Sequence, residues 1–93
     1  MKKLCLEIIT PSGVAIKTEC TSVRFNLSDD LKGMHGGSYG VRIGHTDSIF
    51  ALEKGPVNVF EDEALALSGE CGDGFATVKN NQVKLVVESF LKY

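Results

Sequence analysis

Short runs in which every second residue is apolar, each ended by turn-forming residues, constrain this chain of 93 residues more than any other feature. In the first run Leu4, Leu6 and Ile8 share one face, and Pro11-Ser12-Gly13 then interrupts the pattern. Because successive side chains of a β-strand point to opposite faces, this run predicts a strand with one buried side, followed by a turn.

The same alternation predicts two further strands. The residues expected on their buried faces are Val14, Ile16, Thr18 and Cys20 in one strand and Val23, Phe25 and Leu27 in the other. The next stretch, residues 28–37, reads SDDLKGMHGG and has no sustained period. We therefore expect a long loop there, and long loops in compact domains are often functional.

Two hairpins are predicted in the second half of the sequence. In the first, Val57 and Val59 are separated from Leu65 and Leu67 by the acidic tip Glu61-Asp62-Glu63. In this hairpin the tip carboxylates are expected to be solvated, so they are not predicted to act as paired acid and base groups.

The second hairpin joins residues 75–78 to residues 83–87 through Lys79-Asn80-Asn81-Gln82. Adjacent asparagines tolerate the positive φ that tight hairpin turns require. Residues 47–54 are ambiguous, because Asp47 can cap a helical turn while Ile49–Leu52 can form a buried strand. We favour the strand.

About eight to ten short strands without a helix longer than one turn indicate an all-β fold, either an antiparallel sandwich or a barrel. A chain of this length holds one hydrophobic core, so residues 1–93 are expected to form a single domain. The aromatic residues expected in that core are Phe50, Phe60, Phe75 and Phe90.

Charge and cysteine content exclude several classes of function. The formal net charge is -2 and the isoelectric point is near 5.6, so no nucleic-acid partner is predicted. The sequence contains no signal segment and no apolar run of about 20 residues, so we expect no direct membrane insertion. Three cysteines cannot form a complete disulfide framework, which favours a reducing, intracellular compartment.

Groups that could carry chemistry are scattered along the chain. His35 and His45 have no clustered ligands around them, which argues against a metal site. Glycines in residues 33–40 lack the Gly-Lys-Ser/Thr of a phosphate-binding loop. Flanking glycines could expose the thiol of Cys71, so a thiol enzyme is kept as a minor hypothesis. We predict no catalytic, metal-binding or cofactor-binding residue.

Several short motifs follow one another along residues 4–89. They are Leu6–Gly13, Gly40–His45, Leu52–Val57, Leu67–Gly69, Gly74–Val78 and Asn80–Leu85. In this order they resemble the N-terminal β-sandwich domain of the epsilon subunit of F-type ATP synthases, which is called delta in mitochondria. The resemblance implies a flattened β-sandwich of two antiparallel sheets with about ten strands.

The resemblance also implies a mechanical role. Members of this family sit at the foot of the rotating central stalk, packed on the gamma subunit and resting on the c-subunit ring. There they couple ring rotation to ATP synthesis or hydrolysis without catalysing a reaction themselves. The implied location is the cytoplasmic face of the bacterial inner membrane, through the complex, and the coupled ion can be H⁺ or Na⁺. Exposed partner-binding strands can also self-associate when the subunit is isolated.

By the same resemblance, residues 37–45 face the c ring. His45 matches the family's Gly-His histidine, and Ser38 stands where many members carry a glutamate. Ile43 replaces the proline expected before Gly44. Because the glutamate is absent, no charged contact to the ring is expected from this position, and a neutral hydrogen bond from Ser38 or a contact from Asp29, Asp30 or Lys32 can take its place. The ring-facing residues implied in this way are Ser38, Tyr39, Arg42, His45, Asp29, Asp30 and Lys32.

The sequence departs from the family pattern in length. Residues 28–36 are longer than the usual connection and residues 70–73 are an insertion, and either segment can be an interface adaptation or a tolerated surface loop. Only Phe90–Tyr93 follow Ser89, too few for an independent helix, so we expect the family's inhibitory C-terminal helical hairpin to be absent. The two enlarged loops also support an alternative, a stand-alone ligand-binding β-sandwich.

Overall fold

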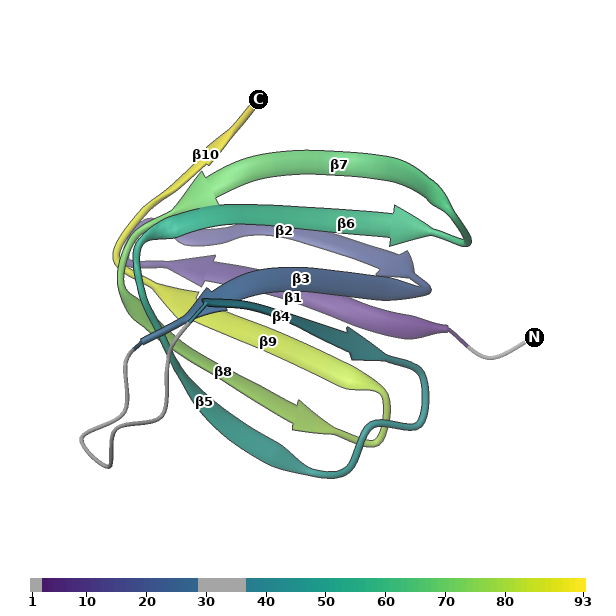
Figure 1. Ribbon diagram of the computed structural model, residues 1–93. Helices are drawn as coiled ribbons and strands as arrows, with labels where there is room; N and C mark the ends of the chain where they lie inside the picture. Colours follow the sequence, from purple (N-terminus) through teal and green to yellow (C-terminus); the bar gives the residue numbers. More distant parts are fainter. Residues whose placement is uncertain (1–2, 29–36) are drawn as a thin grey trace.

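Ten β-strands and the turns between them make up the part of the chain that the computed structural model describes, residues 3–28 and 37–93 (Figure 1). The strands are β1 (Leu4–Thr10), β2 (Gly13–Cys20), β3 (Ser22–Leu27), β4 (Gly37–Arg42), β5 (Ser48–Leu52), β6 (Gly55–Glu61), β7 (Ala64–Cys71), β8 (Gly74–Lys79), β9 (Gln82–Val87) and β10 (Phe90–Lys92). The expected long loop at residues 28–37 falls almost wholly outside the described residues.

Hydrogen-bonded strands follow the order β10-β7-β6-β3-β5-β8-β9-β1-β2, and β4 pairs with β3. The path folds over on itself into two layers, because β1 and β2 pass behind β3 and β6 (Figure 1). Within the described residues, one register pair, Leu27 with Leu52, joins β3 to β5. The first layer thus contains β10, β7, β6, β3 and β4, and the second contains β5, β8, β9, β1 and β2.

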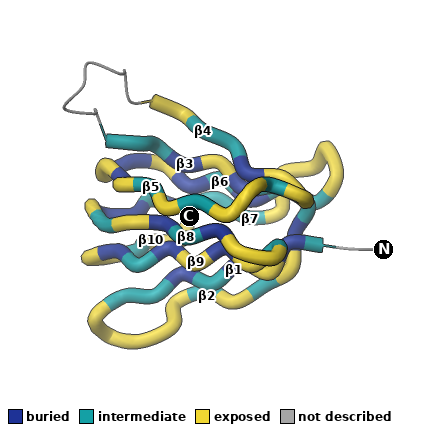
Figure 2. Tube along the Cα trace, turned by 90° about the horizontal axis from the view of Figure 1, so that it is seen from below, coloured by how far each residue is buried: buried dark blue, intermediate teal, exposed yellow. Residues whose placement is uncertain are grey.

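Buried and more exposed residues alternate along much of these strands, as the burial colours of Figure 2 show. The space between the layers is filled by aliphatic residues together with Phe25 and two cysteines. The buried set is Leu4, Leu6, Ile8, Cys20, Val23, Phe25, Val41, Leu52, Val57, Val59, Cys71, Ala76, Val78, Val83, Leu85 and Val87. Burial of these apolar side chains is the main force that holds the layers together.

The predicted all-β sandwich is confirmed. The molecule measures 38 × 29 × 21 Å, and its short dimension fits two sheets about 10 Å apart with side chains on their outer faces. One detail differs from a purely antiparallel arrangement, since β1 pairs with β9 in parallel. Parallel neighbours cannot be joined by a tight hairpin, and here most of the chain lies between the two strands.

Two β-bulges change which face of the sheet apolar residues occupy. The first lies between Ile8 and Ile9 and shifts the register so that Ile9 pairs with Val14. Val14 therefore lies on the outer surface, 55% exposed, and its predicted place on the buried face was wrong. The second lies between Val59 and Phe60, so that Leu65 is 57% exposed and also outside the core. A bulge adds a residue to one strand, which inverts the alternation beyond it.

Both predicted hairpins are confirmed, as is the strand favoured for residues 47–54. Asn80 and Asn81 have φ values of 51° and 61°, the left-handed conformation expected of a tight turn. Ile49 is 78% exposed, so β5 has one open face rather than being wholly buried. Phe75 was expected in the core but is 46% exposed on the outer face of β8.

The C-terminal residues form a strand that the sequence pattern did not predict. β10 pairs with the end of β7, where Phe90 lies opposite Cys71 and Lys92 opposite Gly69. Residues 70 and 71 therefore belong to a strand, and describing residues 70–73 as a surface loop was wrong for this pair. The added residues extend β7 as far as Cys71, which is buried. This extension gives β10 a strand to pair with.

Candidate functional site

Residues expected to face a partner lie on β4 and the turn that follows it. Ser38 and Arg42 are exposed, whereas Tyr39 is half-buried and packs against the core. His45 is half-buried in the turn between β4 and β5. The structure thus separates these four residues into two that face solvent and two that hold the turn in place. The other expected contacts, Asp29, Asp30 and Lys32, lie outside the described residues, as does His35.

Two hydrogen bonds hold the His45 ring between Tyr39 and Thr46, and we call this arrangement the relay. His45 Nδ1 lies 2.7 Å from the carbonyl oxygen of Thr46, and its Nε2 lies 2.7 Å from the Tyr39 hydroxyl. A carbonyl can only accept, so Nδ1 carries the proton in the neutral ring and Nε2 accepts from the hydroxyl. The relay ties the turn to β4, which gives His45 a positioning role.

Aromatic rings pack around this relay. The Tyr39 ring lies 4.9 Å from that of Phe50 and meets the His45 ring edge-on, with centroids 5.8 Å apart. Phe25, from the core, lies 6.4 Å from Tyr39 and 6.2 Å from Phe50. Offset and edge-on aromatic pairs at these separations are attractive, so the rings fix the position of β4 against β3 and β5.

Asn81 at the β8–β9 tip connects this turn to the second layer. Its Oδ1 accepts a hydrogen bond of 2.8 Å from the backbone N–H of Gly44, and its carbonyl oxygen accepts one of 2.8 Å from the N–H of Cys5. One residue therefore joins the β4–β5 turn, the β8–β9 tip and the start of β1. Sequence reasoning recognised Asn81 as a turn former but not as this connection, because the partners are distant in sequence.

Arg24 on β3 is a candidate contact that the sequence analysis missed. It is exposed, and its Nε donates to Ser38 Oγ at 3.2 Å. Gly40 lies directly opposite on β4, and a Cβ there would come within 3.1 Å of Arg24 Nη1. The missing side chain of Gly40 lets the arginine lie across β4. The alternating pattern of β3 could have shown only that Arg24 faces outward, not where its head group lies.

A second surface lies on the outer face of the second layer. Five apolar residues, one from each strand of that layer, are in register with one another. We call them the apolar row, and they are Ala51, Phe75, Val86, Ile9 and Val14. Phe75 and Val14 are the most exposed of the large side chains among them. A continuous apolar band of this kind is typical of a protein contact.

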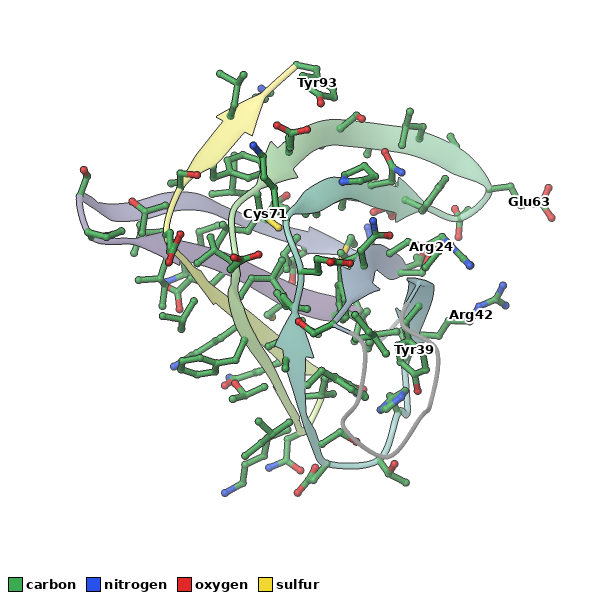
Figure 3. The ribbon with its side chains drawn as sticks, turned by 60° about the vertical axis from the view of Figure 1, so that its left-hand side comes forward. Arg24, Tyr39, Arg42, Glu63, Cys71 and Tyr93 are labelled. Atoms are coloured by element: carbon green, nitrogen blue, oxygen red, sulfur yellow. The ribbon has the colours of Figure 1, made fainter. Side chains whose placement is uncertain are left out.

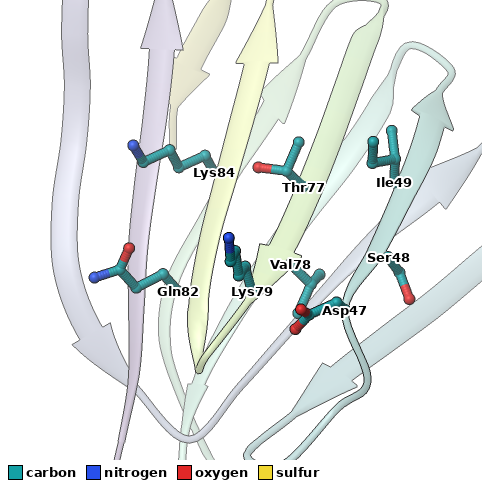
Figure 4. Close-up of a pocket in the computed structure, with 8 residues that line it drawn as sticks. All are labelled: Asp47, Ser48, Ile49, Thr77, Val78, Lys79, Gln82 and Lys84. Atoms are coloured by element: carbon teal, nitrogen blue, oxygen red, sulfur yellow. The ribbon is translucent and has the colours of Figure 1, made fainter.

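Charged residues flank the apolar row along the next register line. That line runs through Ile49, Thr77, Lys84, Glu7 and Lys17. A hollow of about 680 Å³ lies over it between β5 and β9, lined by the residues drawn in Figure 4. The hollow is not lined by residues 70–73, the described insertion that motivated a ligand-binding alternative.

The cysteines do not support thiol chemistry. Cys71 is buried, and burial raises the pKa of its thiol, so the flanking glycines do not expose a nucleophile. Burial, with a smaller contribution from the charge of Glu61, raises the pKa of Cys20 to about 11. Cys5 is exposed. In residues 3–28 and 37–93, no group of three or more metal-ligating side chains is found.

The described part of the chain has no helix of the length and apolar character needed to cross a membrane. No curated protein sequence matches the chain. Solved structures do match its fold. A chain of the Euglena gracilis mitochondrial ATP synthase, in a structure of OSCP, F1 and c-ring, aligns with a TM-score of 0.79 and 16% identity. The alignment covers 97% of this chain and 53% of that one.

A chain of the central stalk and c-ring structure of the Tetrahymena thermophila mitochondrial ATP synthase aligns with a TM-score of 0.72 and 12% identity. It is matched over 97% of this chain and 66% of its own length, so this chain spans between half and two thirds of the two relatives. At these identities the structures show a shared fold. The sequence model for the β-sandwich domain of the ATP synthase delta/epsilon chain matches residues 3–92. This chain therefore belongs to the ATP synthase delta/epsilon family, as the order of its motifs predicted.

Proposed function

We propose that this chain is a non-catalytic rotor subunit of an F-type ATP synthase, which couples rotation of the c ring to the catalytic head through the gamma subunit. The observation that carries the proposal is the family match over residues 3–92. Coupling requires a rigid body that is held by two partners at once. The tightly packed sandwich and its two distinct surfaces suit that task.

The polar surface on β3 and β4 is proposed to face the c ring. It presents Ser38, Arg24 and Arg42 to solvent, and the relay between Tyr39 and His45 holds it in place. Polar groups on a rigid backbone suit a contact with the polar loops of a membrane ring. Asp29, Asp30 and Lys32 stay proposed contributors to this contact.

The apolar row is proposed to pack on the gamma subunit. Permanent interfaces are more apolar than transient ones, and a coupling subunit has to stay attached while it transmits torque. Phe75 and Val14 expose apolar area that water does not favour. The charged line beside the row, with Lys84 and Glu7, would set the register of that contact.

Residues 1–93 are proposed to act as one domain, held peripherally at the cytoplasmic face of a bacterial inner membrane through the complex. The experiment that tests the function is co-expression with the gamma subunit and c ring of the same genome. A stable complex with gamma at micromolar concentration, which also captures the c ring, is the expected result. Failure to bind gamma, with both proteins folded, would contradict the proposal.

A matched pair of measurements separates this function from self-association. Light scattering of the isolated chain and of its mixture with gamma reports the species present. If the apolar row is a gamma contact, any homodimer of the isolated chain should dissociate as gamma is added. A homodimer that persists at saturating gamma would show that the row serves a second copy of the chain instead.

A further inference from the structure

Two arginines share the outer face of β3 and β4. Arg24 lies opposite Gly40, and Arg42 stands two residues further along β4, so the two are diagonal neighbours about 7–8 Å apart. Both side chains extend away from the sandwich on the same side (Figure 3). The bond to Ser38 and the gap above Gly40 fix the direction of the first guanidinium.

Nothing on the neighbouring strands neutralises this pair. Arg24 is opposed by Gly40 on one side and Asn58 on the other, while Arg42 is opposed by Ser22. None of these neighbours is charged. In residues 3–28 and 37–93 the one ion pair joins Lys3 to Glu61, so neither arginine has a carboxylate partner there. Among the described residues, this face of β3 and β4 is thus locally cationic, on a chain with a formal net charge of -2.

We propose that Arg24 and Arg42 form a cationic contact that binds carboxylates on the polar loops of the c ring. This inference rests on the proposed function and adds the charge of the partner to it. A guanidinium binds a carboxylate through two parallel hydrogen bonds, and an arginine already held in one direction loses less side-chain entropy on binding. The ring of the same genome should therefore carry aspartate or glutamate in the loop that faces this subunit.

Protein carboxylates fit this face better than anionic lipid. Recognition of a lipid surface usually requires a cluster of four to eight basic residues. Here two arginines stand among hydroxyl, amide and glycine neighbours, on a chain whose overall charge is negative. Such a small, directed pair suits two carboxylates at defined positions rather than a diffuse negative surface.

The test uses the complex of this chain with gamma, bound to the purified c ring in detergent at low salt. Arg24→Gln and Arg42→Gln remove each charge and keep much of the side-chain length. Lys54→Gln, in the turn between β5 and β6, is the matched control because it removes an exposed charge elsewhere. We expect about tenfold weaker ring binding for each arginine variant, a smaller salt dependence, and unchanged binding to gamma.

Changing one ring-loop carboxylate to arginine should weaken binding of the wild-type chain and restore binding of Arg24→Glu. Ring affinity that is the same for the wild type, both arginine variants and the control would overturn the inference while leaving the proposed function intact. Loss of binding to vesicles of anionic phospholipid, with ring binding unchanged, would assign the face to a membrane and overturn it too. A wild-type chain that binds neither gamma nor the ring would overturn both proposals.

Discussion

The Tyr39 hydroxyl donates a hydrogen bond to Nε2 of His45 across the turn that follows β4. We expect Tyr39→Phe to lower the free energy of unfolding by about 1–2 kcal/mol, because Nε2 of a half-buried ring loses its donor. Urea denaturation measures this change. Phenylalanine keeps the aromatic packing, so the variant isolates the hydrogen bond. Arg42→Gln, exposed on the same strand, should leave stability unchanged, and an equal loss in both variants would contradict the explanation.

Asn81 combines a backbone and a side-chain function that two substitutions separate. Asn81→Gly keeps the positive φ but loses the bond from Gly44, so we expect a cost of about 1 kcal/mol. Asn81→Ala loses the bond and also strains the left-handed backbone, so it should cost about 1 kcal/mol more. Thermal or urea unfolding of both proteins gives the comparison. Equal stability of the two variants would show that the φ value does not matter here.

Alkaline pH should destabilise the protein through Cys20. Its pKa is raised from the ordinary value of 9.0 to about 11 in the folded state, mainly by burial. The contribution of the protonated Cys20 thiol to the stability of the folded state is complete below pH 9. It is lost as the pH rises towards 11, since the thiol of the unfolded chain releases its proton at a lower pH than the folded one. Cys20→Ala removes this titration, at a cost of about 1 kcal/mol for the small cavity. Its stability should fall less steeply over that range than the wild type's.

Charge placed in the apolar row should weaken binding to gamma without unfolding the chain. Phe75→Lys is the sharpest variant, because 46% of the side chain is already exposed and a lysine can extend into water. We expect at least tenfold weaker binding to gamma in a titration, and near-normal unfolding. Leu65→Lys on the first layer is the control, since Leu65 is 57% exposed but outside the row. If only the control weakens binding, gamma packs on the first layer.

Gly69 lets β10 approach β7. A Cβ at this position would lie 2.6 Å from the Leu91 carbonyl oxygen and 2.7 Å from the Phe90 ring. We expect Gly69→Ala to cost about 1–3 kcal/mol and to displace β10. Hydrogen exchange of the Tyr93 N–H, which bonds to the Ser68 carbonyl at 2.9 Å, should then become faster. Gly13→Ala is the contrast, because its cost comes from a φ of 114° at the turn between β1 and β2, a turn that does not pair with β10, and exchange at Tyr93 should stay slow.

Apolar runs and turn signals in the sequence predicted eight of the strands that the structure describes, because burial of one face controls their formation. It failed at Val14, where a bulge inverts the facing of the residues beyond it. A bulge depends on how two strands pair, and the sequence of one strand does not specify which strand it pairs with or in which register. β10 was missed for the same reason, since three residues form a strand only because the edge of β7 receives them.

The candidate site was predicted in part. Resemblance to the family led to Ser38, Arg42 and His45, but it could not separate the residues that face solvent from those that support the turn. Arg24 was overlooked because it is distant from Ser38 in sequence, and only the pairing of β3 with β4 brings the two together. Contacts across strands depend on register, which a local pattern does not specify.

The parallel pairing of β1 with β9 has a consequence for synthesis of the protein. β1 leaves the ribosome before β9, its neighbour in the second layer, which includes Val86, and the strands β2 to β8 are made between them. Until then β1 can pair only with β2, and its other edge stays open to misplaced strands. Closure of the core is therefore a late, non-local step, so folding should be slow for a domain of this size and most vulnerable to aggregation during translation.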